Sequence, residues 1–188
     1  MKNLWTLLSV VIIIFLIIGL WFINGLNYVV KLDEAVRSSW AQVENQLQRR
    51  NDLIPNLVNT VKGYAVHEKD LFTKITELRS QWGKASTEKE KIATANEMSG
   101  IISRLLVVSE NYPDLKANQN FINLQAQLEG TENRIAVERM RYNRMVESFN
   151  SYKRTVFGGL FCSIRGLNAP HEYFSASKDA KNVPVVSF

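Results

Sequence analysis

The sequence has very few of the residues that carry most protein chemistry. Its 188 residues include one cysteine, Cys162, and two histidines, His67 and His171. One cysteine excludes a disulfide framework and a CxxC metal site, and its simplest interpretation is a small buried hydrophobe. The pair His67-Glu68 is not followed by a second histidine at metalloprotease spacing, and no phosphate-binding glycine loop or nucleophile elbow is present. We therefore expect no catalytic residue, no metal and no cofactor, and so a protein that is not an enzyme.

The sequence also lacks a strong excess of charge of either sign. The net charge is +5, and lysine and arginine alternate with aspartate and glutamate along the chain. This pattern is typical of solvated helix faces, so we expect no nucleic-acid partner. The length leaves room for one membrane span and one domain of roughly 130 to 160 residues.

The dominant feature is an apolar run over residues 4–23, diluted only by Thr6, Ser9 and Gly19. A helix of this length crosses roughly 30 Å of hydrocarbon. A signal peptide has a shorter apolar core, of about 7 to 15 residues, and a small-x-small cleavage site that is missing here. We therefore predict an uncleaved signal-anchor helix over residues 1–27. Its transmembrane residues include Leu4, Trp5, Ile13, Phe15 and Ile23.

The side of the membrane follows less directly from the sequence. Lys2 precedes the span, and Lys31 and Arg37 follow it, so the count of basic residues is nearly balanced. A short basic start is typical of a signal anchor that exports the body of the protein. We expect a single-pass protein of the bacterial inner membrane with its domain on the extracytoplasmic side.

Beyond the span, apolar residues recur in steps of three and four, which predicts one continuous helix over residues 28–82. Pro55 lies inside this pattern. It could start a new helix and make a hairpin, or it could kink a single helix. The kink is favoured because the spacing does not slip across Pro55 and no turn residues surround it.

Two more helices follow Gly83 in the prediction. Thr87 and Glu90 match a capping box and begin a helix that ends near Glu110. A turn over residues 111–114 leads to a heptad pattern over residues 121–156, which Gly158-Gly159 ends. The fold class is therefore all-α: a span continuing into a long, Pro-kinked helix, packed with two further helices as an elongated three- to four-helix bundle. We assign residues 28–156 to the bundle and 157–188 to an irregular tail packed on the bundle or on a neighbouring protomer.

The predicted lengths suggest self-association. At 1.5 Å per residue the first helix would extend roughly 80 Å beyond the span, whereas the later helices measure about 35 and 55 Å. An apolar stripe on the first helix would then be left uncovered by the later helices, so the tail, a second copy of the chain or a hairpin at Pro55 must cover it. We predict that this stripe mediates homo-oligomerisation, with the tail contributing. Its members are Tyr28, Leu32, Val36, Trp40, Val43 and Leu47.

Two charged residues fall at positions of the helical pattern that should be apolar. Arg50 and Glu138 both face the predicted core. Since a buried charge needs a partner, we predict that they belong to a polar layer that sets helix register or oligomeric state.

Several motifs resemble the LemA family. The most specific is the run Leu47-Gln48-Arg49-Arg50-Asn51-Asp52-Leu53-Ile54-Pro55-Asn56, in which Arg49, Arg50, Asp52, Pro55 and Asn56 carry the family pattern. Residues 61–68, 112–118 and 128–135 match as well, whereas residues 157–162 replace a more usual proline-containing stretch. The resemblance implies a bacterial membrane protein with one N-terminal span and a helical bundle, without established enzymatic activity or cofactor. It also implies a loose link to membrane zinc metallopeptidases and, for one relative, to magnetosome membranes.

Together these features favour a non-enzymatic, membrane-anchored scaffold that self-associates and organises membrane or partner proteins. The alternative is a membrane-tethered sensor or adaptor that works with a membrane protease or a signalling partner.

Overall fold

The computed structural model of the chain describes residues 2–65 and 67–175. All regular structure in this part of the chain is α-helical, which confirms the predicted fold class. The helices are α1 (Lys2–Lys62), α2 (Lys69–Lys84), α3 (Glu88–Ser109), α4 (Pro113–Lys116), α5 (Gln119–Lys153) and α6 (Val156–Ile164). Two compact units contain them: residues 1–40 with 142–171, and residues 41–141 with 172–188. The end of the predicted tail, residues 176–188, lies outside the described residues.

Helix α1 runs without interruption for 61 residues and contains Pro55, so the proline does not start a hairpin. A proline inside a helix removes one backbone hydrogen bond, a cost that the packing of the flanking residues offsets. Ile54 and Leu57, on either side of it, are both 2% exposed.

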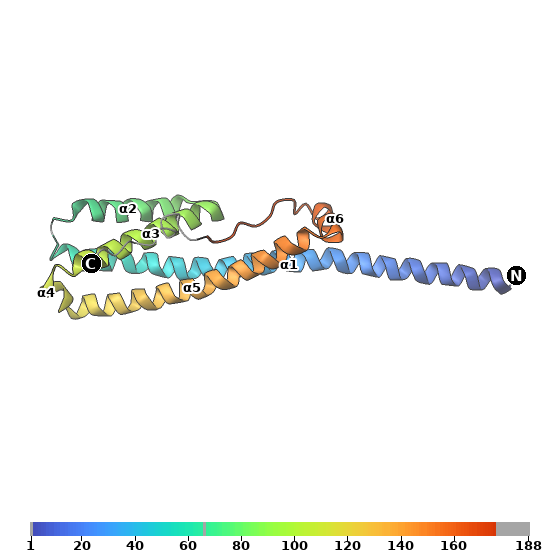
Figure 1. The fold of residues 1–188 in the computed structure, drawn as a ribbon, viewed down its shortest axis with the longest axis horizontal. Coiled ribbons are helices and arrows are strands. Elements are labelled where there is room, and N and C mark those ends of the chain that lie inside the picture. The colour runs from blue at the N-terminus through green and yellow to red at the C-terminus, as the bar shows by residue number, and fades with distance from the viewer. Residues whose placement is uncertain (1, 66, 176–188) are drawn as a thin grey trace, which may run out of the picture. The chain divides into compact units, whose positions relative to one another are not determined.

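The prediction of a single helix as far as Trp82 is wrong. Helix α1 ends at Lys62, and the amides of Tyr64 and Ala65 donate to the Val61 carbonyl as the chain turns. Helix α2 then runs back, and α3 lies beside it (Figure 1). The apolar spacing continues in phase across the turn because both helices face the same core, so the pattern cannot distinguish one helix from two. Gly63, the residue after α1, was the available signal for the break.

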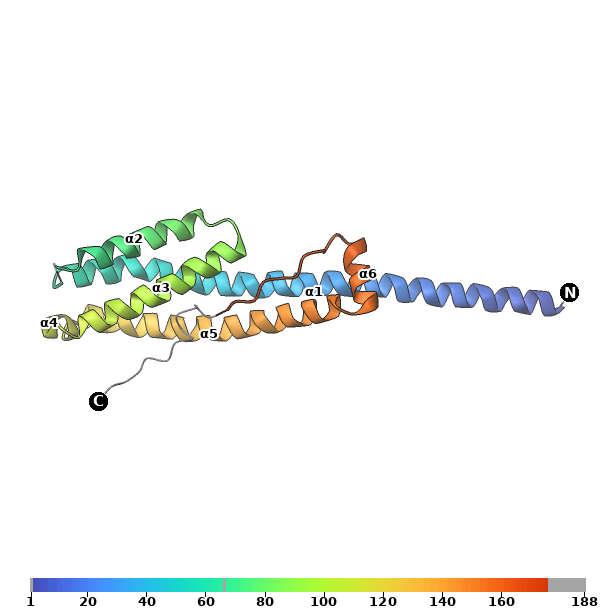
Figure 2. The same ribbon diagram turned by 45° about the horizontal axis from the view of Figure 1, so that its top comes forward.

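The second unit has one hydrophobic core, to which residues 41–62 of α1, helices α2, α3 and α4, and residues 119–141 of α5 contribute. Figure 2 shows how α4 links α3 to α5 at one end of this unit. The predicted capping box is present, since Glu90 N–H donates to Thr87 Oγ1 (3.2 Å) and Thr87 N–H donates to Glu90 Oε2 (3.2 Å). Core side chains include Leu57, Val61, Leu71, Ile75, Leu78, Met98, Ile102, Leu105, Phe121 and Leu128.

The first unit pairs the start of α1 with the end of α5 and with α6. Tyr28 lies edge-on to Tyr152 with ring centroids 4.9 Å apart, and Trp40 lies against Tyr142 at 5.3 Å. Tyr142 is fully buried. These aromatic pairs hold α5 against α1 within this unit.

The end of the last long helix differs from its prediction. Helix α5 ends at Lys153, and Thr155 caps α6 by accepting from the Gly158 amide (3.0 Å). A Cβ at position 158 would lie 2.0 Å from the Tyr152 carbonyl oxygen. Gly158 is therefore needed for a tight corner between two helices, whereas the double glycine suggested a helix stop.

Candidate functional site

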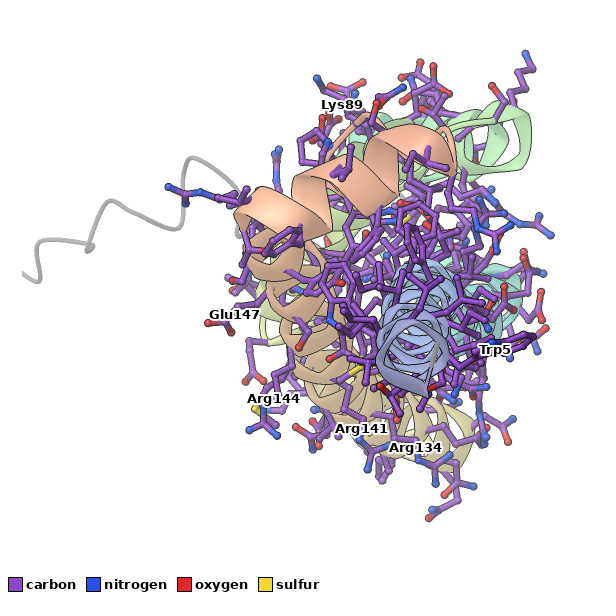
Figure 3. The ribbon with its side chains drawn as sticks, turned by 90° about the vertical axis from the view of Figure 1, so that its right-hand side faces the viewer. Trp5, Lys89, Arg134, Arg141, Arg144 and Glu147 are labelled. Carbon is purple, nitrogen blue, oxygen red and sulfur yellow. The ribbon has the colours of Figure 1, made fainter. Side chains whose placement is uncertain are left out.

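The apolar segment at the start of α1 has the composition of a membrane span. Its most apolar window has a mean hydropathy of 3.0, and none of that window is buried in the structure. Trp5 is 72% exposed and Phe15 71% exposed, and Figure 3 shows Trp5 directed away from the α1 ribbon. The predicted transmembrane residues Leu4, Ile13 and Ile23 are exposed as well. One N-terminal apolar helix of this kind is consistent with a single membrane anchor or a signal sequence.

The stripe expected to mediate self-association is largely covered within one chain. Val36, Val43 and Leu47 are fully buried, and Trp40 is 7% exposed. Leu32 is half-buried, and Tyr28, although 49% exposed, packs against Tyr152. The expectation of an uncovered stripe is therefore wrong, because it rested on a longer first helix than the one observed. Self-association itself stays a prediction.

Arg50 forms the main polar cross-link of the second unit. Its side chain is 1% exposed, and it reaches from α1 to two other helices. One terminal nitrogen, Nη1, donates to Ser99 Oγ on α3 (2.7 Å) and to Glu132 Oε1 on α5 (3.1 Å). The other, Nη2, donates to the Ala95 carbonyl (3.1 Å). Burial lowers the pKa of the Arg50 guanidinium, and the attraction of Glu132 opposes that shift.

Arg50 and Glu138, which we predicted to belong to one polar layer, have different partners in the structure. Glu138 accepts from Arg141 one turn later on the same helix (2.7 Å), and its side chain is 17% exposed. Figure 3 shows Arg141 on the outer side of α5. The long Arg50 side chain instead reaches Glu132, which flanks the buried stripe of α5 and is 35% exposed. Whether either charge sets helix register stays a prediction.

Glu132 also lies near a second arginine. Burial lowers the pKa of the Arg139 guanidinium, Glu132 raises it and the positive charge of Arg50 lowers it further. Arg139 is held over the Phe174 ring, 4.1 Å from its centroid. Glu132 thus balances two arginines, one of which stacks on the C-terminal segment.

Next to Arg50 lies a buried amide without a partner. Asn51 is 3% exposed, and neither its Nδ2 nor its Oδ1 atom makes a hydrogen bond to any residue that the structure describes. Unpaired buried amides cost about 1–3 kcal/mol and call for an explanation. Asn51 lines a groove of about 400 Å³ between α1 and α2. The other residues that line this groove are Gln48, Asp52, Thr76, Arg79, Ser80, Trp82 and Gly83.

The groove combines polar groups of several kinds. Gln48 Nε2 donates to Asp52 Oδ1 (2.8 Å), and Gln48 Oε1 lies 3.5 Å from the indole nitrogen of Trp82. Arg79 supplies a positive charge on the α2 side. In residues 2–65 and 67–175, no group of three or more histidine, cysteine, aspartate or glutamate side chains is placed to hold a metal ion. The groove therefore offers hydrogen bonds and an aromatic surface, which are the elements of a binding site.

The residues of the family motif, Leu47–Asn56, divide into buried and exposed ones. Arg50 and Asn51 point into the bundle, whereas Arg49, Asp52 and Asn56 are exposed and Pro55 is half-buried. Sequence reasoning singled out Arg50 but missed Asn51, Glu132 and the α2 side of the groove. The unbroken run of polar residues from Gln48 to Asp52 was the signal for Asn51.

These features define a class: an all-helical protein with an N-terminal apolar helix and a bundle cross-linked by a buried arginine. The family model of LemA matches residues 39–188, and the chain belongs to the LemA family. The match begins beyond the apolar segment of α1. The chain is also similar to Protein LemA of Metamycoplasma hominis, with 22% identity over 131 aligned residues. The aligned region covers 69% of this chain and 60% of that protein. The chain thus matches less than two thirds of this relative's length.

Proposed function

We propose that the protein is a non-enzymatic, membrane-anchored adaptor that binds an extended peptide segment of a partner in the α1–α2 groove. Helix α1 would span the bacterial inner membrane once and hold the bundle at its extracytoplasmic surface. The observation that carries the proposal is the buried Asn51 amide, whose donor and acceptor both lack partners among the described residues.

A primary amide matches the chemistry of a peptide backbone. Its N–H donates to a peptide carbonyl while its oxygen accepts from a peptide N–H. Trp82 offers an apolar surface, and Arg79 and Asp52 offer charges of both signs for flanking side chains. A partner of the membrane-protease or signalling kind would supply such a segment, and the groove would recognise it without any chemical step.

A scaffold that self-associates is the second candidate, and one observation favours it. Ile122, Val137 and Met140 lie along one face of α5 and are 43%, 42% and 49% exposed. Residues 18 apart on a helix are five full turns apart and share a direction, so Ile122 and Met140 point the same way. If the protein forms homo-oligomers, this face of α5 is a better interface than the buried stripe of α1.

Site-specific photo-crosslinking in native membranes tests the adaptor function. A photoreactive residue at Ser80 lies at the groove, and one at Val107, which is 68% exposed on α3, is the matched control. We expect partner adducts from position 80 and none from position 107. The Asn51→Leu variant should remove the adducts, because Leu has a similar shape and cannot pair with a peptide. It should fold, since replacing an unpaired buried amide by an apolar group costs little.

Mass photometry of the detergent-solubilised protein separates the two candidates. Single protomers that crosslink a partner from position 80 support the adaptor. A monodisperse oligomer that dissociates when Met140 is changed to Glu supports the scaffold. Adducts that persist unchanged in Asn51→Leu contradict the role of the groove.

A further inference from the structure

Helix α6 exposes an apolar face that the bundle does not cover. Val156, Phe157, Leu160 and Ile164 are 84%, 55%, 50% and 51% exposed. They recur at helical spacing and form one stripe. The opposite face carries Gly158, Phe161 and Cys162, which are buried. Helix α6 thus has two apolar faces, and the rest of the described structure covers only one of them.

Rings from both faces of α6 contact the end of the apolar run of α1. Phe157 lies edge-on to Trp21, with ring centroids 5.0 Å apart, and Phe161 lies 5.5 Å from both Trp21 and Phe22. The Phe161 ring occupies the space beside Gly25, where a Cβ would come within 2.2 Å of it. Figure 1 shows α6 next to α1, and in the turned view of Figure 2 it runs across α1. Helix α6 therefore lies crosswise where α1 leaves its apolar segment.

Cationic and polar side chains line a pocket in the same unit. Lys31, Arg165, Asn24 and Asn27 line a pocket of about 550 Å³ together with Tyr28. Neither Lys31 nor Arg165 makes a side-chain ion pair with any residue in the part of the chain that the structure describes. Asn24, Asn27 and Lys31 follow Trp21 along α1 by about one to three turns, beyond the end of the apolar run. Arg165 directly follows α6.

We propose that α6 is a membrane-surface helix that inserts its exposed face into the bilayer spanned by α1, with Lys31 and Arg165 binding an anionic lipid headgroup. This inference rests on the membrane anchor of the proposed function and is independent of the α1–α2 groove. The apolar stripe lies at the level of Trp21, where interfacial aromatics belong, and the cations lie beyond it, at headgroup level. An anionic headgroup supplies the charge that the two cations lack.

The position of the stripe favours the bilayer over a second protein as its occupant. The exposed side chains of α6 join the apolar surface of α1 through the Trp21–Phe157 contact. A protein docked on α6 would have to enter the membrane interface to reach this surface. Lipid is already present there.

Fluorescence quenching in nanodiscs tests the insertion. In full-length protein carrying Cys162→Ser, single cysteines replace Leu160, Ile13 or Val107 and are labelled with bimane. The nanodiscs contain phosphatidylcholine and phosphatidylglycerol, with doxyl-labelled lipid or aqueous iodide as quencher. Ile13 lies within the apolar run and reports the anchor, and Val107 is an exposed apolar control on α3.

We expect the label at position 160 to be quenched by doxyl lipid and shielded from iodide at least threefold relative to position 107. Doxyl quenching at position 13 with none at position 160 would overturn the inference and leave the anchor standing. Absence of quenching at position 13 would contradict the anchor itself, and with it the inference. Because Cys162→Ser alters a buried residue, the circular dichroism of each labelled protein is compared with the wild type.

The headgroup site has its own measurement. Native mass spectrometry of protein released from mixed nanodiscs counts the lipids that stay bound. We expect phosphatidylglycerol to be enriched at least threefold over its bulk fraction, and the Lys31→Gln/Arg165→Gln double variant to lose that enrichment. Arg134→Gln, which removes an exposed charge on α5, is the matched control and should retain it. Equal enrichment in the double variant would overturn the headgroup site.

Discussion

Replacing Arg50 with alanine should loosen the contact between α1, α3 and α5. The Arg50 guanidinium donates hydrogen bonds to two helices at once. Its acceptors are Ser99 and Ala95 on α3 and Glu132 on α5. Removing it leaves the Ser99 hydroxyl and the Glu132 carboxylate without their strongest donor. It also empties the volume of the largest fully buried side chain in the described residues.

The expected destabilisation is about 3–5 kcal/mol. Removing one partner of a buried ion pair costs about 3–5 kcal/mol. The Glu132 side chain is 35% exposed, so water recovers part of its solvation and the polar loss is discounted to about 1–3 kcal/mol. The buried methylene groups of Arg50 add about 2 kcal/mol, at roughly 0.8 kcal/mol for each. Arg50→Met keeps most of that stem and should lose only the polar part.

Hydrogen exchange of the full-length protein in nanodiscs measures the effect at the right place. A loss of 3 kcal/mol raises the exchange rate of amides near Ala95 about a hundredfold when opening is fast and reversible. Arg49→Ala removes the neighbouring exposed arginine and should change these rates less than threefold. If Arg50→Ala and Arg49→Ala give the same rates at α3, the cross-link does not hold the helices and the reasoning fails.

Three further changes test separate parts of the structure. Hydrogen bonds from backbone amides lower the pKa of Glu90, so its charged form stabilises the start of α3. That contribution to stability is present above about pH 4.5 and is lost as the pH falls through the lowered pKa. Glu90→Gln should therefore remove this part of the acid transition when hydrogen exchange of α3 is measured over a series of pH values. Glu138→Leu should change the thermal unfolding midpoint and the oligomeric mass little, because the carboxylate is paired only with the exposed Arg141 among the contacts described. A broadened transition or a changed mass would instead support a role of Glu138 in helix register. Asn150→Ala removes both hydrogen bonds to the His171 backbone (2.9 and 3.0 Å), so limited proteolysis should cut near residue 171 several times faster, and an unchanged rate would show that the segment is held by other contacts.

Sequence reasoning predicted the helices where the pattern had a single solution. The apolar run of α1, the Thr87–Glu90 capping box and the heptads of α5 each specify one local structure. The end of α1 at Lys62 was missed because two antiparallel helices facing one core repeat the same spacing as one long helix. Because of that error, the apolar stripe over residues 28–47 of the first helix was expected to be uncovered.

The polar residues of the candidate site were only half predictable for a related reason. Arg50 stood out because a charge occupied an apolar position. Its partner depended on the rotation of α5, which decides whether Glu132 or Glu138 comes within reach. Asn51 and the groove depended on α2, a helix that the pattern had merged with α1. Long-range pairing of this kind is a property of the packed helices and leaves little trace in the spacing of any one of them.

The contact between Gly25 and Phe161 has a consequence for the order in which the protein is made. More than 130 residues separate the two positions in the sequence. At about 5–20 residues per second, the ribosome adds Phe161 roughly 7 to 30 s after Gly25. During that interval Trp21 and Phe22 have no ring from α6 beside them, so this part of α1 exists before the helix that closes over it has been made. Helix α6, the last helix in the described residues, thus completes the surroundings of the first.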